Sequence, residues 1–339
     1  MSETVLVTGG SGFIASWCII ELLQQGYAVR TTVRSEAKAS SLRESLRPFV
    51  TASAQLSFFN ADLTNDFSWD AAVRGCDYVL HVASPIGAGR RITDPNELIV
   101  PARDGALRVL RASCNAGIRR VVMTSSVAAA GSQRVDGNAS HDETQWTDLR
   151  APKLNAYRQS KTIAERAAWD FMRSQERATS LVTILPSVVL GPVLSMESLG
   201  SVQLVSRLLD GSTPGCPRLG FCIVDVRDVA RAHLLAMTSN VAAGERFIVA
   251  GEFMWMKEIA LLLREHLAAR GKEIPTRELP DFLVHIAAFF NPPLREITPN
   301  LGHKHVYSAA KAQRLLGWSP RSSVSTVVEC AESLLARTQ

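Results

Sequence analysis

The sequence predicts an α/β fold, in which a doubly wound parallel sheet is followed by a smaller mixed α/β lobe. Three observations lead to this prediction. Short apolar strand patterns alternate with helix patterns over the first 190 residues, the order typical of a parallel sheet with helices on both faces. The strand that begins at residue 4 runs directly into a glycine-rich turn. The regular alternation ends after Pro192.

The strands and helices of the first half can be assigned in chain order. Apolar or β-branched runs that end in turn residues predict strands at 4–8, 27–34, 56–63, 77–84, 119–126 and 180–192. Apolar residues with helical spacing predict helices at 13–26, 36–46, 95–117 and 154–175. Later elements are shorter and are separated by Gly- and Pro-rich loops. We expect one domain over residues 1–190 and a smaller lobe over 191–339, with late segments returning to the first sheet.

Composition and charge argue against several classes of protein. The chain has 339 residues, of which 46% are hydrophobic and 20% are charged, so a buried core is expected and global disorder is not. The net charge is +5, but no basic run exceeds two residues, which argues against nucleic-acid binding and allows phosphorylated ligands. No apolar run reaches the ~18 residues of a membrane span. The acidic N-terminus does not resemble a signal peptide, so we expect a cytoplasmic protein.

Cysteine and histidine spacing predicts neither a disulfide framework nor a metal site. The six cysteines form no C-x-x-C pair and lie mostly in apolar stretches. The seven histidines contain no H-E-x-x-H motif, so we expect no metal.

A glycine-rich turn joins the first strand to the first helix in "VLVTGGSGFIA" (5–15). Gly9, Gly10 and Gly12 let the backbone turn sharply and approach a pyrophosphate, to which the start of the helix presents unpaired N–H groups. Ala15 is small enough for the helix to pack closely on the strand. In this strand–turn–helix context the pattern predicts dinucleotide binding on a Rossmann-type sheet. A turn with a purely structural role is the alternative.

The end of the second strand indicates which dinucleotide is bound. NAD-binding sheets usually carry an acid there for the ribose 2′-hydroxyl, whereas this chain has Arg34, with Lys38 one turn into the next helix. A guanidinium or an ammonium at this place suits a 2′-phosphate, so we expect NADPH (NADP) as the cofactor. Exposed loop cations are the alternative interpretation, and Glu36 leaves NAD open.

Two further strand ends offer contacts to the dinucleotide. Asp62 follows the third strand, where a carboxylate can reach the adenine amino group or belong simply to a loop. Ala83 and Ser84 end the fourth strand in "HVASP" (81–85). Their small side chains leave room for a ribose or a nicotinamide against the backbone.

Two tyrosines, Tyr157 and Tyr307, are each followed four residues later by a lysine, Lys161 and Lys311. This spacing places both side chains on one helix face, where the cation can stabilise the phenolate that is left by proton donation. Only Tyr157 and Lys161 open a helix after a strand that ends in serines, 119–126. Such strand ends border the ligand crevice of a parallel sheet. We therefore expect the first pair to be catalytic, and Tyr307 to be a structural residue at the head of a helix.

The sequence resembles the extended short-chain dehydrogenases/reductases. The motifs that carry the resemblance are "TGGSGFIA", "HVASP", "VVMTSS", "YRQSKTIAERAAW" and "LPSVVLGP". Within this family it looks most like the branch of dihydroflavonol reductases and NADPH-dependent aldehyde or ketone reductases, through "TTVRS", the pattern S-K-T-x-A-E-x-A-A-W after Tyr157 and "FCIVDVRDVARAHLLAM". The resemblance covers nearly the whole chain, and its motifs are specific in combination.

The resemblance implies a catalytic set of Ser126, Tyr157 and Lys161. Tyr157 would protonate the carbonyl oxygen, Ser126 would hydrogen-bond it, and Lys161 would support the tyrosine and the nicotinamide ribose. Ser126 is preferred because the family uses the serine immediately before the small-residue turn. The implied cofactor contacts are Thr8, Gly9, Ser11, Gly12, Phe13, Ile14, Arg34, Lys38, Asp62, Leu63, Val82, Ala83, Ser84, Ser125, Tyr157, Lys161, Pro186 and Val189. The substrate pocket is expected between the sheet's carboxyl edge and the C-terminal lobe, lined by Ser84, Ile86 and Gln133.

These features together predict an NADPH-dependent reductase, that is, an NADP-dependent alcohol dehydrogenase or carbonyl reductase. Hydride would pass from the nicotinamide C4 to an aldehyde or ketone, such as an aromatic carbonyl or a dihydroflavonol-like compound. Two alternatives stay open: an NAD-dependent nucleotide-sugar epimerase or dehydratase, which Arg34 disfavours, and a non-catalytic NADP-binding sensor. The expected partner is a small carbonyl compound, bound by a monomer or homodimer, with no nucleic acid and no membrane.

Overall fold

Seven parallel strands form the central sheet, in the order β11-β7-β5-β4-β1-β2-β3. The computed structural model describes residues 2–51, 55–85, 92, 94–131, 139–152, 154–176, 178–196, 199–267 and 273–337. The strands are β1 (Thr4–Val7), β2 (Ala28–Val33), β3 (Leu56–Asn60), β4 (Tyr78–His81), β5 (Arg120–Thr124), β7 (Ser180–Pro186) and β11 (Arg246–Val249). The strand order reverses between β1 and β4, so a ligand crevice is expected beyond their carboxyl ends.

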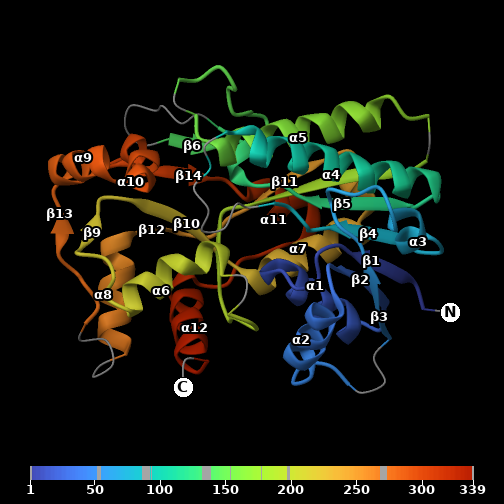
Figure 1. Cartoon of the computed structure of the whole chain (residues 1–339), viewed down its shortest axis with the longest axis horizontal. Coiled ribbons are helices and arrows are strands. Elements are labelled where there is room, and N and C mark those ends of the chain that lie inside the picture. Colours follow the sequence, from blue (N-terminus) through green and yellow to red (C-terminus); the bar gives the residue numbers. More distant parts are fainter. Residues whose placement is uncertain are drawn as a thin grey trace.

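Helices cover both faces of this sheet (Figure 1). One layer holds α3 (Trp69–Val73), α4 (Asn96–Asn115) and α5 (Ala156–Arg173), whose apolar side chains share a core with β1, β4, β5 and β7. The other layer holds α1 (Phe13–Gln24), α2 (Glu36–Leu46), α7 (Val226–Thr238) and α11 (Ala310–Leu316). The predicted doubly wound α/β class is therefore confirmed.

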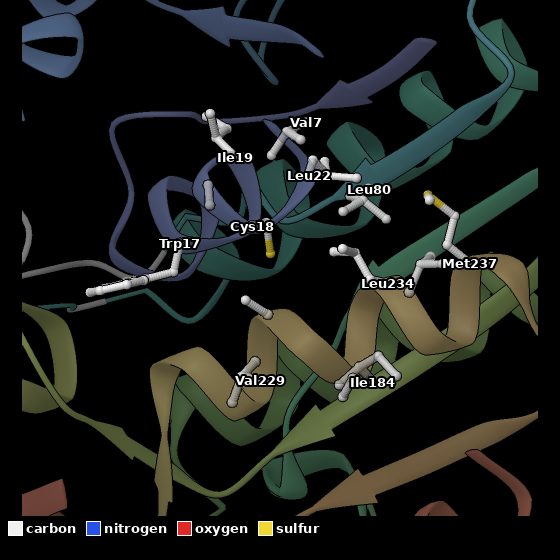
Figure 2. Packing of buried hydrophobic residues seen from close by; sticks show 14 of the residues in the cluster. Val7, Trp17, Cys18, Ile19, Leu22, Leu80, Ile184, Val229, Leu234 and Met237 are labelled. Carbon is white, nitrogen blue, oxygen red and sulfur yellow. The ribbon is translucent and has the colours of Figure 1, made fainter. Parts of the chain in front are cut away.

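The contact between α1 and α7 lies at the centre of the second layer. Figure 2 shows Cys18 of α1 and Leu234 of α7 in the space between the two helices, with Leu22 and Leu80 beside them, whereas Val229 lies on the opposite side of α7. All five side chains are buried. Because α7 follows residue 190 in the chain, part of the C-terminal half completes the core under the N-terminal glycine turn.

The C-terminal lobe is built on a mixed three-stranded sheet. β10 (Gly220–Asp225) pairs in parallel with β8 (Val188–Leu190) and antiparallel with β12 (Phe253–Trp255). The helices α6 (Gln203–Leu209), α8 (Met256–His266) and α12 (Ser323–Leu335) enclose its apolar core. At the far end lie α9 (Asp281–Phe290), α10 (Pro292–Ile297) and the paired strands β9 (Cys216–Pro217) and β13 (Glu278–Leu279) (Figure 1).

A second two-stranded pair joins distant parts of the chain. β6 (Ala139–His141) pairs in parallel with β14 (His305–Tyr307), although more than 160 residues separate them. Neither strand was expected from the sequence, because three residues are too few to show a periodicity. The run at 180–192 is also not one strand, since Ser187 separates β7 from β8.

Other properties of the chain follow from the same structure. All six cysteines are buried thiols. Within the described ranges, no helix is long and apolar enough to cross a membrane. β11 lies in the first sheet although it comes late in the chain, whereas the division of the chain at residue 190 stays a prediction.

Candidate active site

The glycine turn lies where β1 and β4 diverge. Gly9 has φ +70°, and a Cβ atom there would lie 2.9 Å from the Cβ of Ala83. A Cβ on Gly10 would lie 2.2 Å from Thr31 Oγ1. Both positions therefore require glycine, because side chains would collide with the neighbouring strand ends.

The start of α1 is open toward the crevice. Gly12 is the N-cap residue and is extended (φ −78°, ψ 154°), with no side chain that caps the helix. Ser11, Phe13 and Ile14 are partly exposed around it, whereas Thr8 is completely buried. Thr8 fixes the neighbouring loop, because its Oγ1 accepts a hydrogen bond from Ala83 N at 3.0 Å. Exposed backbone at a helix start is what a pyrophosphate requires.

The predicted adenosine side of the crevice holds Arg34, Lys38, Asp62 and Leu63. Arg34 is exposed directly after β2, and Ser35 caps α2 by accepting a bond from Lys38 N. Hydrogen bonds from Thr64 hold the pKa of the Asp62 carboxyl below its usual range, and the positive charge of Arg34 acts in the same direction. Leu63 instead packs against Gly105 of α4.

The predicted catalytic pair lies at the beginning of α5. Asn155 caps this helix, and its side chain accepts a hydrogen bond from Arg158 N at 2.8 Å. Lys161 is only 6% exposed, and its Nζ lies 5.9 Å from the centre of the Tyr157 ring. The Lys161 ammonium donates to Ser84 Oγ at 3.0 Å, which joins α5 to the end of β4. The Tyr157 side chain remains accessible, at 36% exposure.

The two serines after β5 have different surroundings. Ser125 donates its hydroxyl proton to the buried carboxylate of Glu165 at 2.6 Å. Ser126 accepts a bond from Ala128 N at 3.1 Å, and its own proton has no acceptor among the residues that the structure describes. Its short helix, η1 (Val127–Ala129), packs against α5. Of the two serines, Ser126 is thus the one whose hydroxyl proton is not used by another described residue.

The end of β7 forms the predicted nicotinamide wall. Pro186 and Val189 are buried, and Val82 is partly exposed across the crevice. Ser187 is also buried, and its Oγ has no hydrogen-bond partner in the described part of the chain. A buried hydroxyl without a partner calls for a polar group such as a water, an ion or a ligand. This hydroxyl and the uncapped start of α1 are compatible with a bound dinucleotide.

Two predicted substrate contacts, Ile86 and Gln133, lie outside the described residues. Ser84, the third, lies at the site through its bond to Lys161. The lining of the substrate pocket therefore stays a prediction.

The second tyrosine–lysine pair has no comparable surroundings. Tyr307 ends β14 and does not head a helix, since α11 begins only at Ala310. Burial raises the pKa of Tyr307 above its usual value, which disfavours the phenolate there. The Lys311 ammonium is engaged by Glu245 at 2.6 Å.

His81 belongs to the site but was missed in the sequence. Its Nδ1 is 3.0 Å from Thr8 Oγ1, and burial together with the positive charge of Lys161 lowers its pKa to about 3. His233 lies 2.7 Å from Thr124 Oγ1 through its Nε2, and burial lowers its pKa to about 4. A histidine inside a predicted buried strand, as in "YVLHVAS", is the signal that could have identified the first of these.

These two imidazoles predict that acid destabilises the fold. Below about pH 6.5 they take up protons in the unfolded chain but stay neutral in the folded one, so the stability falls as the pH falls toward about 4. These two groups contribute a slope of about 2.7 kcal/mol per pH unit between about pH 6 and pH 4.5. His305, whose pKa burial also lowers to about 4, adds to it. Urea unfolding at several pH values measures this slope. His233→Gln should remove about 1.4 kcal/mol per pH unit of this slope, and an unchanged slope in the variant would contradict the assignment.

Comparison with known proteins places this geometry in a family. The profile of the NAD dependent epimerase/dehydratase family matches residues 5–250. Anthocyanidin reductase of Vitis vinifera is 36% identical over 280 residues, covering 77% of this chain and 80% of that protein. Dihydroflavonol 4-reductase of Zea mays is 35% identical over 270 residues, covering 77% and 74%.

A solved structure is similar over the full length. The crystal structure of yeast methylglyoxal/isovaleraldehyde reductase Gre2, complexed with NADPH, superposes with a TM-score of 0.81 at 26% identity, covering 99% of both chains. The resemblance to the extended short-chain dehydrogenases/reductases, in the dihydroflavonol reductase branch, is thereby confirmed. The chain belongs to the NAD dependent epimerase/dehydratase family.

Proposed function

We propose that the protein is an NADPH-dependent reductase that converts an aldehyde or ketone into the corresponding alcohol. The observation that carries this proposal is the group formed by Tyr157, the buried Lys161 and Ser84, beside Ser126 at the carboxyl edge of the sheet. Relatives that are named as reductases of anthocyanidin and of dihydroflavonol, and the NADPH complex of Gre2, support it. A small carbonyl substrate, an alcohol dehydrogenase classification, a cytoplasmic location and a monomeric or homodimeric state belong to the same proposal.

The side chains of the site can carry out the proton chemistry of this reaction. Bound NADPH supplies the hydride for the carbonyl carbon. Tyr157 gives its phenolic proton to the carbonyl oxygen, which the Ser126 hydroxyl holds by a hydrogen bond. The Lys161 cation stabilises the resulting phenolate. Because Tyr157 is partly exposed, solvent can return the proton before the next turnover.

The cofactor preference rests on the tip of β2. Arg34 is exposed there, and a guanidinium at this position suits a 2′-phosphate. Glu36, the residue that left NAD open, lies one turn into α2, and its carboxylate is 3.4 Å from the exposed Arg43 guanidinium, a weak surface contact. Arg34, and not Glu36, directly follows β2, which favours the reductase over the epimerase with its retained NAD.

Consumption of NADPH tests the proposal directly. The purified protein is offered aromatic aldehydes, aryl ketones, β-ketoesters and flavanonols, and each assay is repeated with NADH. We expect oxidation of NADPH with at least one class, and slower oxidation of NADH. Protein that retains NAD and converts nucleotide sugars would support the epimerase instead. Tight NADPH binding without turnover on the whole panel would support the sensor.

A further inference from the structure

A buried carboxylate lies two turns below the predicted catalytic tyrosine. Glu165 is 0% exposed and stands on α5, eight residues after Tyr157 and four after Lys161. Its Oε1 accepts bonds from Thr183 Oγ1 and from Arg246 Nε, both at 2.8 Å. Its Oε2 accepts from Ser125 at 2.6 Å. One side chain of α5 is thus bound to the end of β5, to β7 and to β11.

Arg246 extends this set of contacts toward the segment before α5. Its Nη1 donates to the backbone oxygens of Glu143 at 2.6 Å and Gln145 at 3.1 Å. Its guanidinium also lies 3.6 Å from the centre of the Trp146 ring. Since Arg246 is only 8% exposed, both its charge and its hydrogen bonds are used inside the protein.

The segment after Trp146 carries the contacts back to the catalytic end of α5. Thr147 Oγ1 donates to the backbone oxygens of Ala128 at 2.8 Å and Gly131 at 3.0 Å, in the turn that follows Ser126. Arg158 Nη2 donates to Gly131 O at 3.0 Å and to Thr147 Oγ1 at 3.1 Å. The contacts form a closed ring, because Arg158 is again part of α5.

This ring encloses the predicted catalytic residues without touching the reacting atoms. Ser125 precedes Ser126, Arg158 follows Tyr157, and Glu165 lies one turn beyond Lys161. A buried ion pair is a poor source of stability, because apolar side chains of similar volume commonly stabilise as much or more. What the ion pair does provide is a fixed distance and orientation between secondary-structure elements, since each bond holds one element against another.

We propose that Glu165 and Arg246 are a positioning pair that fixes α5 against the serine end of β5 and so sets where the Tyr157 and Ser126 hydroxyls meet the substrate carbonyl. The proposal rests on the proposed function, because it assigns the pair a role in the same reaction. Displacements of about 1 Å can cost about 100-fold in rate, so a small movement of α5 is enough to matter.

Glu165→Gln tests the pair while keeping the size of the side chain. We expect kcat for carbonyl reduction to fall about 30- to 100-fold, with the NADPH dissociation constant changed less than about threefold. In the reverse reaction, alcohol oxidation, the rise of kcat with pH should move to higher pH, because Lys161 would stabilise the phenolate less well. A role in stability alone would leave this pH profile in place.

Two further variants separate positioning from folding. In Glu165→Leu combined with Arg246→Met, no buried charge is left unpaired, so we expect the variant to fold and to show the low kcat. Its melting temperature should be lower than that of the wild type, because the hydroxyls of Ser125 and Thr183 lose their acceptor. Val182→Ala is the matched control, because Val182 is completely buried beside Thr183 on β7 and packs in the core that α1 and α7 share, on the other face of the sheet from α5. It should lower the melting temperature and leave kcat and the pH profile unchanged.

The outcomes are distinct for the two proposals. If the Glu165 variants keep the wild-type kcat and pH profile while Tyr157→Phe is inactive, the positioning pair is wrong and the reductase stands. If Tyr157→Phe keeps its activity, the proposed function itself fails. The positioning role would also be overturned if a Glu165 variant lost no more kcat than Val182→Ala does when the two proteins have equal melting temperatures. Should Glu165→Gln not fold, the double variant decides alone.

Discussion

Tyr157→Phe should lower kcat for carbonyl reduction by about 10³-fold, within the range that general acid catalysis contributes. The change removes one oxygen atom from a partly exposed side chain, so the ring can keep its place near the Lys161 ammonium. NADPH binding should therefore stay close to that of the wild type. Stopped-flow or steady-state oxidation of NADPH gives kcat, and fluorescence titration gives the dissociation constant.

Tyr307→Phe is the matched control for this change. Tyr307 shares the spacing to a lysine, but it lies in β14 and its lysine is bound by Glu245. We expect a loss of kcat of less than about tenfold, because Tyr307 hydrogen-bonds Arg158 on α5 but is not expected to touch the reacting atoms. Equal losses of kcat in the two variants would show that Tyr157 was wrongly assigned as the catalytic tyrosine on the basis of its place in the sheet.

Arg34→Asp should reverse the preference between the two dinucleotides. Loss of about two charge-assisted hydrogen bonds to the 2′-phosphate, with repulsion added, corresponds to about 10³-fold in the ratio of kcat/KM for NADPH over NADH. The new carboxylate can also accept a bond from the ribose 2′-hydroxyl of NADH. Steady-state kinetics with both dinucleotides measures the ratio.

Arg47→Asp changes the net charge by the same amount at the other end of α2, and Arg47 is likewise exposed. It should leave the ratio near its wild-type value. A similar fall in both variants would mean that the overall charge, and not the tip of β2, selects the dinucleotide. An unchanged ratio in Arg34→Asp would remove the basis for NADPH as the preferred cofactor.

Local signals were sufficient for the elements that form the crevice. The helix predicted at 36–46 has these bounds in α2, because Ser35 caps it and apolar residues recur on one face. The glycine turn could be recognised because a Cβ atom at Gly9 or Gly10 would collide with neighbouring residues, so that only glycine fits at these two positions. Tyr157 and Lys161 could also be recognised, because their proposed chemistry depends on a spacing of four residues within one helix.

Contacts between distant segments could not be derived in this way. Glu165 stood inside a recognised motif, yet its partners Thr183 and Arg246 lie 18 and 81 residues away. A charged residue among the buried positions of a helix was the one available signal, and it names no partner. Tyr307 was placed on the wrong kind of element because its pairing strand, β6, begins at residue 139. Such pairings depend on the whole packed chain, which no short window of sequence contains.

The position of β11 late in the chain has a consequence for co-translational folding. Residues 1–190 contain six of the seven strands of the sheet, but Arg246 opens the seventh. Until that arginine has been synthesised, Glu165 has no cation for its buried carboxylate, and leaving such a charge unpaired is strongly unfavourable. We therefore expect the nascent chain to assemble its reaction site only after the first part of the C-terminal lobe has been synthesised, although nearly all the residues that build the site come from the first half.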